Sequence, residues 1–428
     1  MRRVLLVLPT TTYRASAFLK AAKRVGVEVL TASDQPAERV PLLRDRFVEV
    51  ALDDPALAAT QLCATDARSP IDAVIAVDDQ GVVPAALAAE RLGLVHSPPR
   101  AVMATRDKAR LRAALSQAEV PQPDFAVLDA TGEAGEVIAR ARRAVRELGY
   151  PVVVKPTSMS ASQGVIRADD DAALAAAVAR VLPLVRCATP FGAEPGALAQ
   201  LLVERYLPGT EVALEAILRD GVLHRVALFD KPDPLVGPYF AETIYVTPSR
   251  LCPALHDEVD AVVAKAVAAL GLSEGPIHAE VRLAPDATAG QGGVALIEIA
   301  ARTIGGRCSS ALAFASGATL EELVLRYALG ETPDIALAPG ASGVLMLPVP
   351  ATGRLRRVEG IAKAEAIEAI TGVEIAITPG SEVAALPEGD RYLGFVFARG
   401  ESPEEVETAL RQAKAALSVE IATEQVSR

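Results

Sequence analysis

The sequence predicts a mixed α/β protein, with a parallel sheet near its N-terminus and an antiparallel α+β part after it. Short β-branched runs alternate with Ala-rich helical stretches over the first hundred residues, a pattern typical of parallel sheets flanked by helices. Two strong hairpin signals follow after residue 200. Hydrophobic residues make up 51% of the 428 positions, enough to bury a core, and this length favours about three domains.

The N-terminal pattern predicts four strands and two helices. Strands are expected over 4–8, 28–32, 47–50 and 73–77, and helices over 15–25 and 82–92. The Pro98-Pro99 pair breaks this alternation and marks a domain boundary. A second α/β block follows, with helices near 108–117 and 134–148 and strands over 125–128 and 152–155.

The antiparallel part is predicted from two hairpins. Asp220-Gly221 separates apolar runs over 210–219 and 222–228, because Asp-Gly favours the left-handed conformations of a tight turn. The second hairpin joins 278–283 to 294–299 through a Gly-rich turn, and a helix over 255–270 lies between the two hairpins. After residue 340 we expect strands, a helix near 362–370 and a terminal helix near 403–417.

Composition and missing motifs exclude several classes of protein. Lys plus Arg is 43 against 54 for Asp plus Glu, and this net charge of −11 disfavours nucleic-acid binding. The scattered cysteines (Cys63, Cys187, Cys252 and Cys308) predict neither disulfides nor zinc, and no apolar run is long enough for a membrane helix. We therefore expect a cytoplasmic protein without nucleic-acid or membrane partners. The sequence also lacks GxxxxGK[ST], GxGxxG after a strand, GxSxG and HExxH motifs.

The chemistry must then rest on Lys, Arg and carboxylates. They occur as an ordered set of segments: Thr105 to Lys108, Pro151 to Pro156, the small-residue loop Ser158 to Val165, Leu201 to Glu211, Glu280 to Arg282, and Glu298 to Gly306. A lysine that ends an apolar strand can hold a phosphate, and backbone N–H groups of a small-residue loop can approach one closely. A symmetric hairpin centred on residue 289 pairs Glu280 with Glu298, and such facing carboxylates favour Mg²⁺ between them.

This ordered set resembles the ATP-grasp superfamily of carboxylate–amine ligases. Within it, the run Ala300 to Gly306 and the C-terminal region are most similar to bacterial L-amino acid ligases, which form dipeptides. The resemblance extends over about 4–417. It implies an ATP-grasp fold with a Rossmann-like N-terminal domain (1–100), an ATP-grasp domain (101–340) whose lid spans about 120–205, and a C-terminal α+β domain (341–428).

The resemblance implies a role for each motif. Lys108 and Lys155 would contact phosphates, while Ser160, Ser162 and Gly164 would belong to a flexible lid. Glu204, Arg205 and Leu207 would hold adenine, and Glu211 the ribose. Glu280 and Glu298 would hold two Mg²⁺ ions, with Mn²⁺ as a substitute, and Arg302 with the N–H of Gly305 would stabilise an oxyanion. Lys231, Glu242 and Arg307 are candidates for the substrate pocket. Ala300 stands where many superfamily members have Asn, which puts one metal contact in doubt.

The expected activity is an ATP-dependent ligation. A carboxylate, expected to be an amino acid, would be joined to an amine through an acyl-phosphate, releasing ADP and phosphate from a homodimeric enzyme. Three alternatives stay open: a carboxylase or ribonucleotide–amine ligase, a non-catalytic nucleotide-binding regulatory module, and a nicotinamide dehydrogenase. At the residue level, Glu280 and Glu298 could instead pair with Arg282 or Arg302. Asp78 and Asp79 could bind ligand or cap the helix that follows them.

Overall fold

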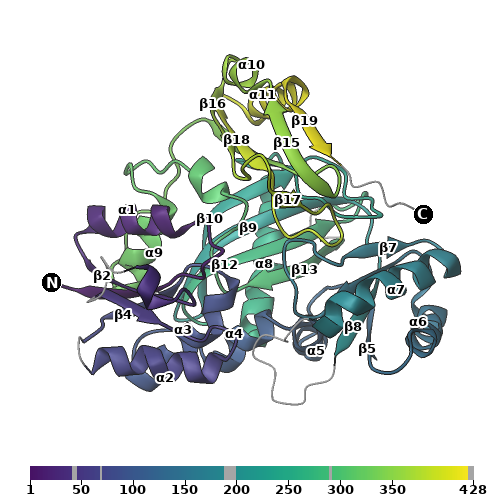
Figure 1. Cartoon of the computed structure of the whole chain (residues 1–428), viewed down its shortest axis with the longest axis horizontal. Coiled ribbons are helices and arrows are strands. Elements are labelled where there is room, and N and C mark those ends of the chain that lie inside the picture. The colour runs from purple at the N-terminus through teal and green to yellow at the C-terminus, as the bar shows by residue number, and fades with distance from the viewer. Residues whose placement is uncertain (41–45, 68–69, 188–198, 289–291, 423–428) are drawn as a thin grey trace.

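The computed structural model describes residues 1–40, 46–67, 70–187, 199–288 and 292–422. The strands of these residues form four sheets (Figure 1). A small parallel sheet lies at the N-terminal side, a lid sheet lies at the opposite side, and a large antiparallel sheet runs between them, with the C-terminal elements beside it.

The N-terminal sheet has the order β3-β2-β1-β4, with all pairs parallel, as predicted. Its strands are β1 (Arg3–Val7), β2 (Glu28–Ser33), β3 (Phe47–Glu49) and β4 (Ala73–Ala76). Helices α1 (Ala15–Val25), α2 (Pro55–Asp66) and α3 (Asp79–Leu92) accompany it, and α2 was not predicted. Residues 4–7 of β1 are fully buried and belong to two apolar clusters, so helices cover both faces of the sheet.

The lid sheet has the order β5-β8-β6-β7 and is antiparallel. It consists of β5 (Phe125–Asp129), β8 (Gln200–Arg205), β6 (Val152–Pro156) and β7 (Ile166–Ala168). Helices α6 (Ala134–Leu148) and α7 (Asp171–Cys187) supply the apolar side chains that cover it. Two helices, α4 (Pro99–Thr105) and α5 (Lys108–Gln117), connect the lid to the N-terminal sheet.

The central sheet has eight strands in the order β13-β12-β9-β10-β11-β14-β18-β16. Their bounds are β9 (Thr210–Arg219), β10 (Val222–Lys231), β11 (Ile244–Thr247), β12 (Gly275–Leu283), β13 (Val294–Ala300), β14 (Ala341–Leu347), β16 (Ile370–Ile375) and β18 (Gly394–Gly400). Helix α8 (Pro253–Leu270) packs its apolar face on one side of β9 and β12. The sheet continues past residue 340, so strands on both sides of the expected domain boundary share one hydrogen-bonded ladder.

Both predicted hairpins are present. Asp220 and Gly221 have φ values of 52° and 76°, in the left-handed region that the turn requires. In the second hairpin Glu280 pairs with Glu298, as predicted, and a register shift follows directly on the turn side of Glu280. The bulge therefore leaves the carboxylate pair intact.

The C-terminal region packs against the end of the central sheet (Figure 1). Its remaining elements are β15 (Gly353–Glu359), α10 (Ile361–Glu365), β17 (Glu382–Val383), α11 (Pro403–Ala416) and β19 (Ser418–Ala422). The expected helix near 362–370 was wrong in its second half, because the helix ends at Glu365 and Ile370 begins strand β16. Helix α9 (Leu320–Ala328) packs against α1. No helix in the described ranges is long and apolar enough to cross a membrane.

Candidate active site

One face of the central sheet carries a row of charged side chains. Side chains alternate along a strand, so Glu211 and Glu215 of β9 share a face, as do His278, Glu280 and Arg282 of β12. The register places Glu215 beside His278 and Glu211 beside Arg282. The intervening residues, including Val212, Leu214, Ala279 and Val281, face the α8 side and fill the core. One strand pair therefore builds both a core and a polar surface.

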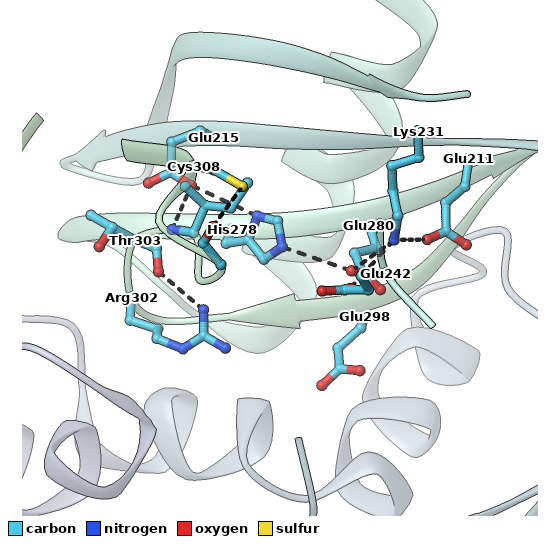
Figure 2. A network of polar contacts seen from close by, with 12 residues as sticks. Glu211, Glu215, Lys231, Glu242, His278, Glu280, Glu298, Arg302, Thr303 and Cys308 are labelled. Carbon is cyan, nitrogen blue, oxygen red and sulfur yellow. Dashed lines mark hydrogen bonds and ion pairs between the residues drawn. The ribbon is translucent and has the colours of Figure 1, made fainter. Parts of the chain in front are cut away.

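Lys231 of β10 lies beside Glu211 at one end of the row (Figure 2). Its ammonium contacts the Glu211 carboxylate and lies 3.2 Å from Glu280 and 3.5 Å from Glu242. Although burial opposes its charge, these three carboxylates hold the pKa of Lys231 above its usual value. Arg282 contributes a second contact to Glu211, at 2.7 Å. Glu211 thus has two cationic partners, while Glu242 and Glu280 share Lys231.

Glu280 and Glu298 have the chemistry expected of Mg²⁺ ligands. Burial raises the pKa of Glu280, and so do the carboxylates of Glu211 and Glu242, while the Lys231 ammonium acts in the opposite direction. Glu298 lies 3.1 Å from the ammonium of Lys108. Across the described segments, no three or more His, Cys, Asp or Glu side chains are grouped to hold a metal by themselves. Two carboxylates fit a Mg²⁺ ion whose other ligands are phosphate oxygens and water.

The two predicted phosphate lysines come from different elements. Lys108 begins helix α5, where the Asp107 side chain accepts hydrogen bonds from the first turn, and its ammonium donates to the Met159 carbonyl at 2.6 Å. Lys155, in β6, lies 2.6 Å from Glu204 of the neighbouring strand β8. Burial lowers the pKa of Lys155, and the Glu204 carboxylate counteracts that effect. Both lysines are buried, and each is held by a polar partner.

The predicted adenine residues lie at the end of β8. Glu204 is buried and is also paired with Arg112 at 2.5 Å, and that arginine donates to the Ile297 carbonyl of β13 at 2.7 Å. Arg112 therefore connects the lid sheet to the strand that carries Glu298. The Arg205 N–H donates to the Asp124 carbonyl at 2.8 Å, so a backbone contact from Arg205 to a base would use its carbonyl oxygen.

The predicted lid loop is held against the C-terminal region. The Gly164 N–H donates to the Pro387 carbonyl at 2.8 Å, and the Gln163 side chain donates to the Glu388 carbonyl at 2.8 Å. Ala161 and Ser162 have φ values of 54° and 58°, a left-handed conformation that is uncommon for residues with a side chain. The loop thus joins the phosphate lysines on one side to the residues near Pro387 on the other.

Arg302 makes a two-pronged ion pair with Asp79 of helix α3. The distances are 2.8 and 2.9 Å, and Arg106 adds a third contact at 3.0 Å. Burial disfavours the charge on Asp79, but the two guanidinium groups hold its pKa below the usual range. The first turn of α3 is capped by Asp78, so these two neighbouring aspartates have separate roles. The N-terminal domain therefore orients the predicted oxyanion residue.

The loop after Arg302 is fixed by residues far away in the sequence. The Ile304 N–H donates to Glu215 at 2.9 Å, and the Gly306 N–H donates to the Tyr13 hydroxyl at 2.7 Å. Arg14 donates to the Thr303 carbonyl at 3.2 Å. Between these anchored N–H groups, the Gly305 N–H has no hydrogen-bond acceptor among the residues that the structure describes. This arrangement is compatible with the predicted oxyanion donor.

Two of the three predicted substrate residues lie beside the carboxylates, and the third lies apart from them. Lys231 and Glu242 face each other (Figure 2). The Tyr392 hydroxyl donates to Glu242 at 2.7 Å. Arg307 instead pairs with Glu374 of β16 at 2.5 Å. Glu242 also lines a cavity of about 380 Å³ between the lid loop, residues 238–242 and two C-terminal loops.

Sequence reasoning missed several buried polar residues of this site. Arg112, Glu215 and His278 are each buried, and burial and the Arg302 charge lower the pKa of His278 to about 3. Polar and apolar residues alternate along β9 and β12, and this alternation indicates a polar face that includes Glu215 and His278. Tyr13 and Tyr392 gave no such signal, because only the tertiary fold brings them to the site.

Comparisons with known proteins agree with this geometry. A sequence model of the ATP-grasp domain matches residues 148–311, and one of the ATP-grasp N-terminal domain matches residues 19–96. A model described as L-amino acid ligase C-terminal domain 2 matches residues 345–422. Residues 148–311 therefore form an ATP-grasp domain. The mixed α/β fold is similar to that of a solved L-amino acid ligase.

Individual relatives of the chain agree with these domain matches. Alanine–anticapsin ligase of Bacillus subtilis is 29% identical over 250 residues, which are 55% of this chain and 49% of that ligase. The chain thus spans about half the length of that relative. An L-amino acid ligase structure from Bacillus licheniformis has a TM-score of 0.77 at 23% identity and 99% coverage of both chains. A carboxyaminoimidazole ribonucleotide synthase from Aspergillus clavatus, complexed with ATP, has a TM-score of 0.71 at 16% identity, covering 97% of this chain and 98% of that one.

Proposed function

We propose that this ATP-grasp protein is an ATP-dependent carboxylate–amine ligase that joins two amino acids. One observation carries the proposal: Glu280 and Glu298 pair across β12 and β13, while Lys108 lies beside Glu298 and Arg302 follows four residues after it. A phosphate-binding group, two metal-type carboxylates and an oxyanion-type arginine therefore meet at one strand pair. The alanine–anticapsin ligase relative and the C-terminal family match favour amino acids as substrates.

In the first half-reaction, a carboxylate oxygen of one substrate attacks the γ-phosphorus of ATP. The bond from phosphorus to the β,γ-bridging oxygen breaks, ADP leaves, and an acyl-phosphate forms. Lys108 and Lys155 orient the phosphates, and the buried pairing of each lysine keeps its position fixed. Mg²⁺, held by Glu280 and Glu298, would neutralise phosphate charge when bound. We expect two such ions, which Mn²⁺ can replace.

In the second half-reaction, the amine nitrogen attacks the acyl carbon. The carbonyl oxygen gains negative charge, the C–O bond to phosphate breaks, and the nitrogen passes its proton to the departing phosphate as the amide forms. Arg302 and the Gly305 N–H would stabilise that oxygen, and removing one such donor typically costs on the order of 10²–10³ in turnover. The lid loop excludes water, which would otherwise hydrolyse the acyl-phosphate.

A screen of substrates tests the proposal. Phosphate release is measured with ATP, Mg²⁺ and amino acids, singly and in pairs, and products are identified by mass spectrometry. An amide product from a pair is the expected result. Turnover with bicarbonate alone would support a carboxylase of the kind that shares this fold, and nucleotide binding without any turnover would support a regulatory module.

The assembly and location of the protein are part of the same proposal. The family resemblance favours a homodimer in the cytoplasm. Size-exclusion chromatography with light scattering should give a particle of twice the 44.6 kDa chain mass. A particle of single-chain mass at micromolar concentration would contradict the dimer without affecting the proposed reaction.

A further inference from the structure

We infer that the cavity between the lid loop and the C-terminal region binds the amine substrate as an α-amino acid, with its ammonium at Glu242 and its carboxylate at Arg391. This inference rests on the proposed ligase function and names the place of its second substrate. The cavity has a volume of about 380 Å³, within the ~300–1,000 Å³ typical of small-molecule sites.

The inner wall of the cavity is anionic and lies beside the reaction centre. Glu242 lines the cavity, and its neighbour Lys231 also contacts Glu280, the predicted metal ligand. One oxygen of Glu242 accepts from Tyr392 and the other faces Lys231 at 3.5 Å. An ionised carboxylate has about four lone-pair positions, so Glu242 can also accept from an ammonium group. This end of the cavity therefore favours an amine and repels a second carboxylate.

The outer wall carries the guanidinium of Arg391 beside the exposed carboxylate of Asp390. Arg391 lines the cavity, is exposed, and has no ion pair or hydrogen bond with any residue of the described ranges. A planar guanidinium binds a carboxylate with two parallel hydrogen bonds. The cavity thus has opposite charges on two of its lining residues, as a zwitterionic amino acid requires.

Between the two charges the lining is mainly apolar. Ala241, Val349, Ala385 and Leu386 contribute to it, together with prolines of the same loops. Such a surface suits a small or medium apolar side chain. The other substrate needs a different environment, because its carboxylate must reach the cationic groups around Arg302. The end near Glu242 therefore accepts a positively charged group, and the end near Arg302 accepts a negatively charged one.

A partition experiment tests the inference. Hydroxylamine is a small nucleophile that needs no amino-acid site, so it captures the acyl-phosphate as a hydroxamate, while an amino acid gives a dipeptide. With both nucleophiles present, Arg391→Met should lower the ratio of dipeptide to hydroxamate about fivefold, the upper range for losing a solvent-exposed ion pair. Arg391→Lys should recover part of that ratio. The exposed Arg356 provides a matched control, and Arg356→Met should leave the ratio unchanged.

A second variant tests the shape of the site. Ala385→Leu fills part of the cavity and should shift the preferred amine toward glycine and alanine, with an unchanged melting temperature showing that the fold is intact. An unchanged ratio in Arg391→Met, together with unchanged amine preference in Ala385→Leu, would overturn the inference while leaving the ligase function in place. If the unmodified protein forms neither dipeptide nor hydroxamate with any amino acid, the proposed function fails and this inference fails with it.

Discussion

At the scale of single residues, the site brings several carboxylates close together, and lysine side chains between them neutralise part of their charge. Lys231 lies among three carboxylates, and Lys108 lies beside Glu298. The Lys231 ammonium, a hydrogen bond with Glu280 and the Tyr392 hydroxyl hold the pKa of Glu242 below its usual value, even though burial acts in the opposite direction.

Glu298→Gln should abolish ADP formation and leave the fold intact. The amide keeps the size of the side chain but removes the negative charge that a metal ligand needs. We expect a fall of at least 100-fold in ADP production, with an unchanged circular-dichroism spectrum. Glu368→Gln, at an exposed position of the C-terminal region, is the control and should retain full activity. Normal ADP production in Glu298→Gln would remove this residue from the metal site.

The pH dependence of stability should report on Glu215. Burial raises its pKa above that of the unfolded chain, so between about pH 4.3 and the raised value the folded state binds more protons. Stability from this group is then lost as the pH rises through that interval, by up to ~1.4 kcal/mol per pH unit. Glu215→Gln removes this pH dependence. The free energy of unfolding of the variant, measured with urea, should therefore rise relative to that of the parent between pH 5 and pH 7.

One result of these unfolding measurements would contradict a raised pKa of Glu215. A difference between Glu215→Gln and the parent that stays constant with pH would show that Glu215 is already ionised at pH 5. The amide can still accept the Ile304 N–H, so loss of that hydrogen bond does not complicate the result.

At the scale of elements, alternation along β9 and β12 places the charged row on one face and the core on the other. The register of these two strands decides which charges meet. Gly209, directly before β9, fixes where that strand begins. It has φ of +122°, and a Cβ there would lie 1.8 Å from the Leu283 carbonyl oxygen at the end of β12. Both the conformation and the close approach require glycine.

Gly209→Ala should destabilise the protein by roughly 2 kcal/mol or more, because a backbone oxygen cannot move aside as a flexible side chain can. Its melting temperature should fall, and ATP should protect it less than the parent. Gly135→Ala is a matched control in helix α6, where nothing lies within 4 Å of the added Cβ. That change should leave the melting temperature equal or higher. Equal melting temperatures for Gly209→Ala and the parent would contradict the close approach.

At the scale of the whole molecule, parts distant in the sequence fix each side of the site. The N-terminal domain supplies Asp79 to orient Arg302, and Tyr13 to hold the loop after it. The C-terminal region supplies Glu388, which pairs with Arg180 of the lid helix α7 at 2.6 Å. Arg180 also donates to the Tyr239 hydroxyl at 2.5 Å. All three regions therefore contribute contacts to the proposed active site.

Arg180→Met should loosen the lid. The ion pair is about half-exposed, so its loss is worth at most ~1 kcal/mol, or about fivefold in the opening equilibrium. Amide hydrogen exchange over residues 158–165 should speed up by up to that factor, and the KM for ATP should rise with it. Arg143→Met on the exposed side of α6 is the control. Equal exchange in both variants would show that the lid closes independently of the C-terminal region.

Local patterns in the sequence determined the elements, the hairpin pairing of Glu280 with Glu298 and the family resemblance. Periodicity and turn chemistry are properties of neighbouring residues, so helices such as α1 and α6 matched their predicted bounds. The helix expected up to residue 370 failed, because pairing of β16 with β18 overrides local propensity. Only the tertiary structure decided that Asp79, rather than Glu298, neutralises Arg302, and that Tyr392 faces Glu242. Such contacts join residues more than a hundred positions apart, and chain packing alone brings those residues within hydrogen-bond distance.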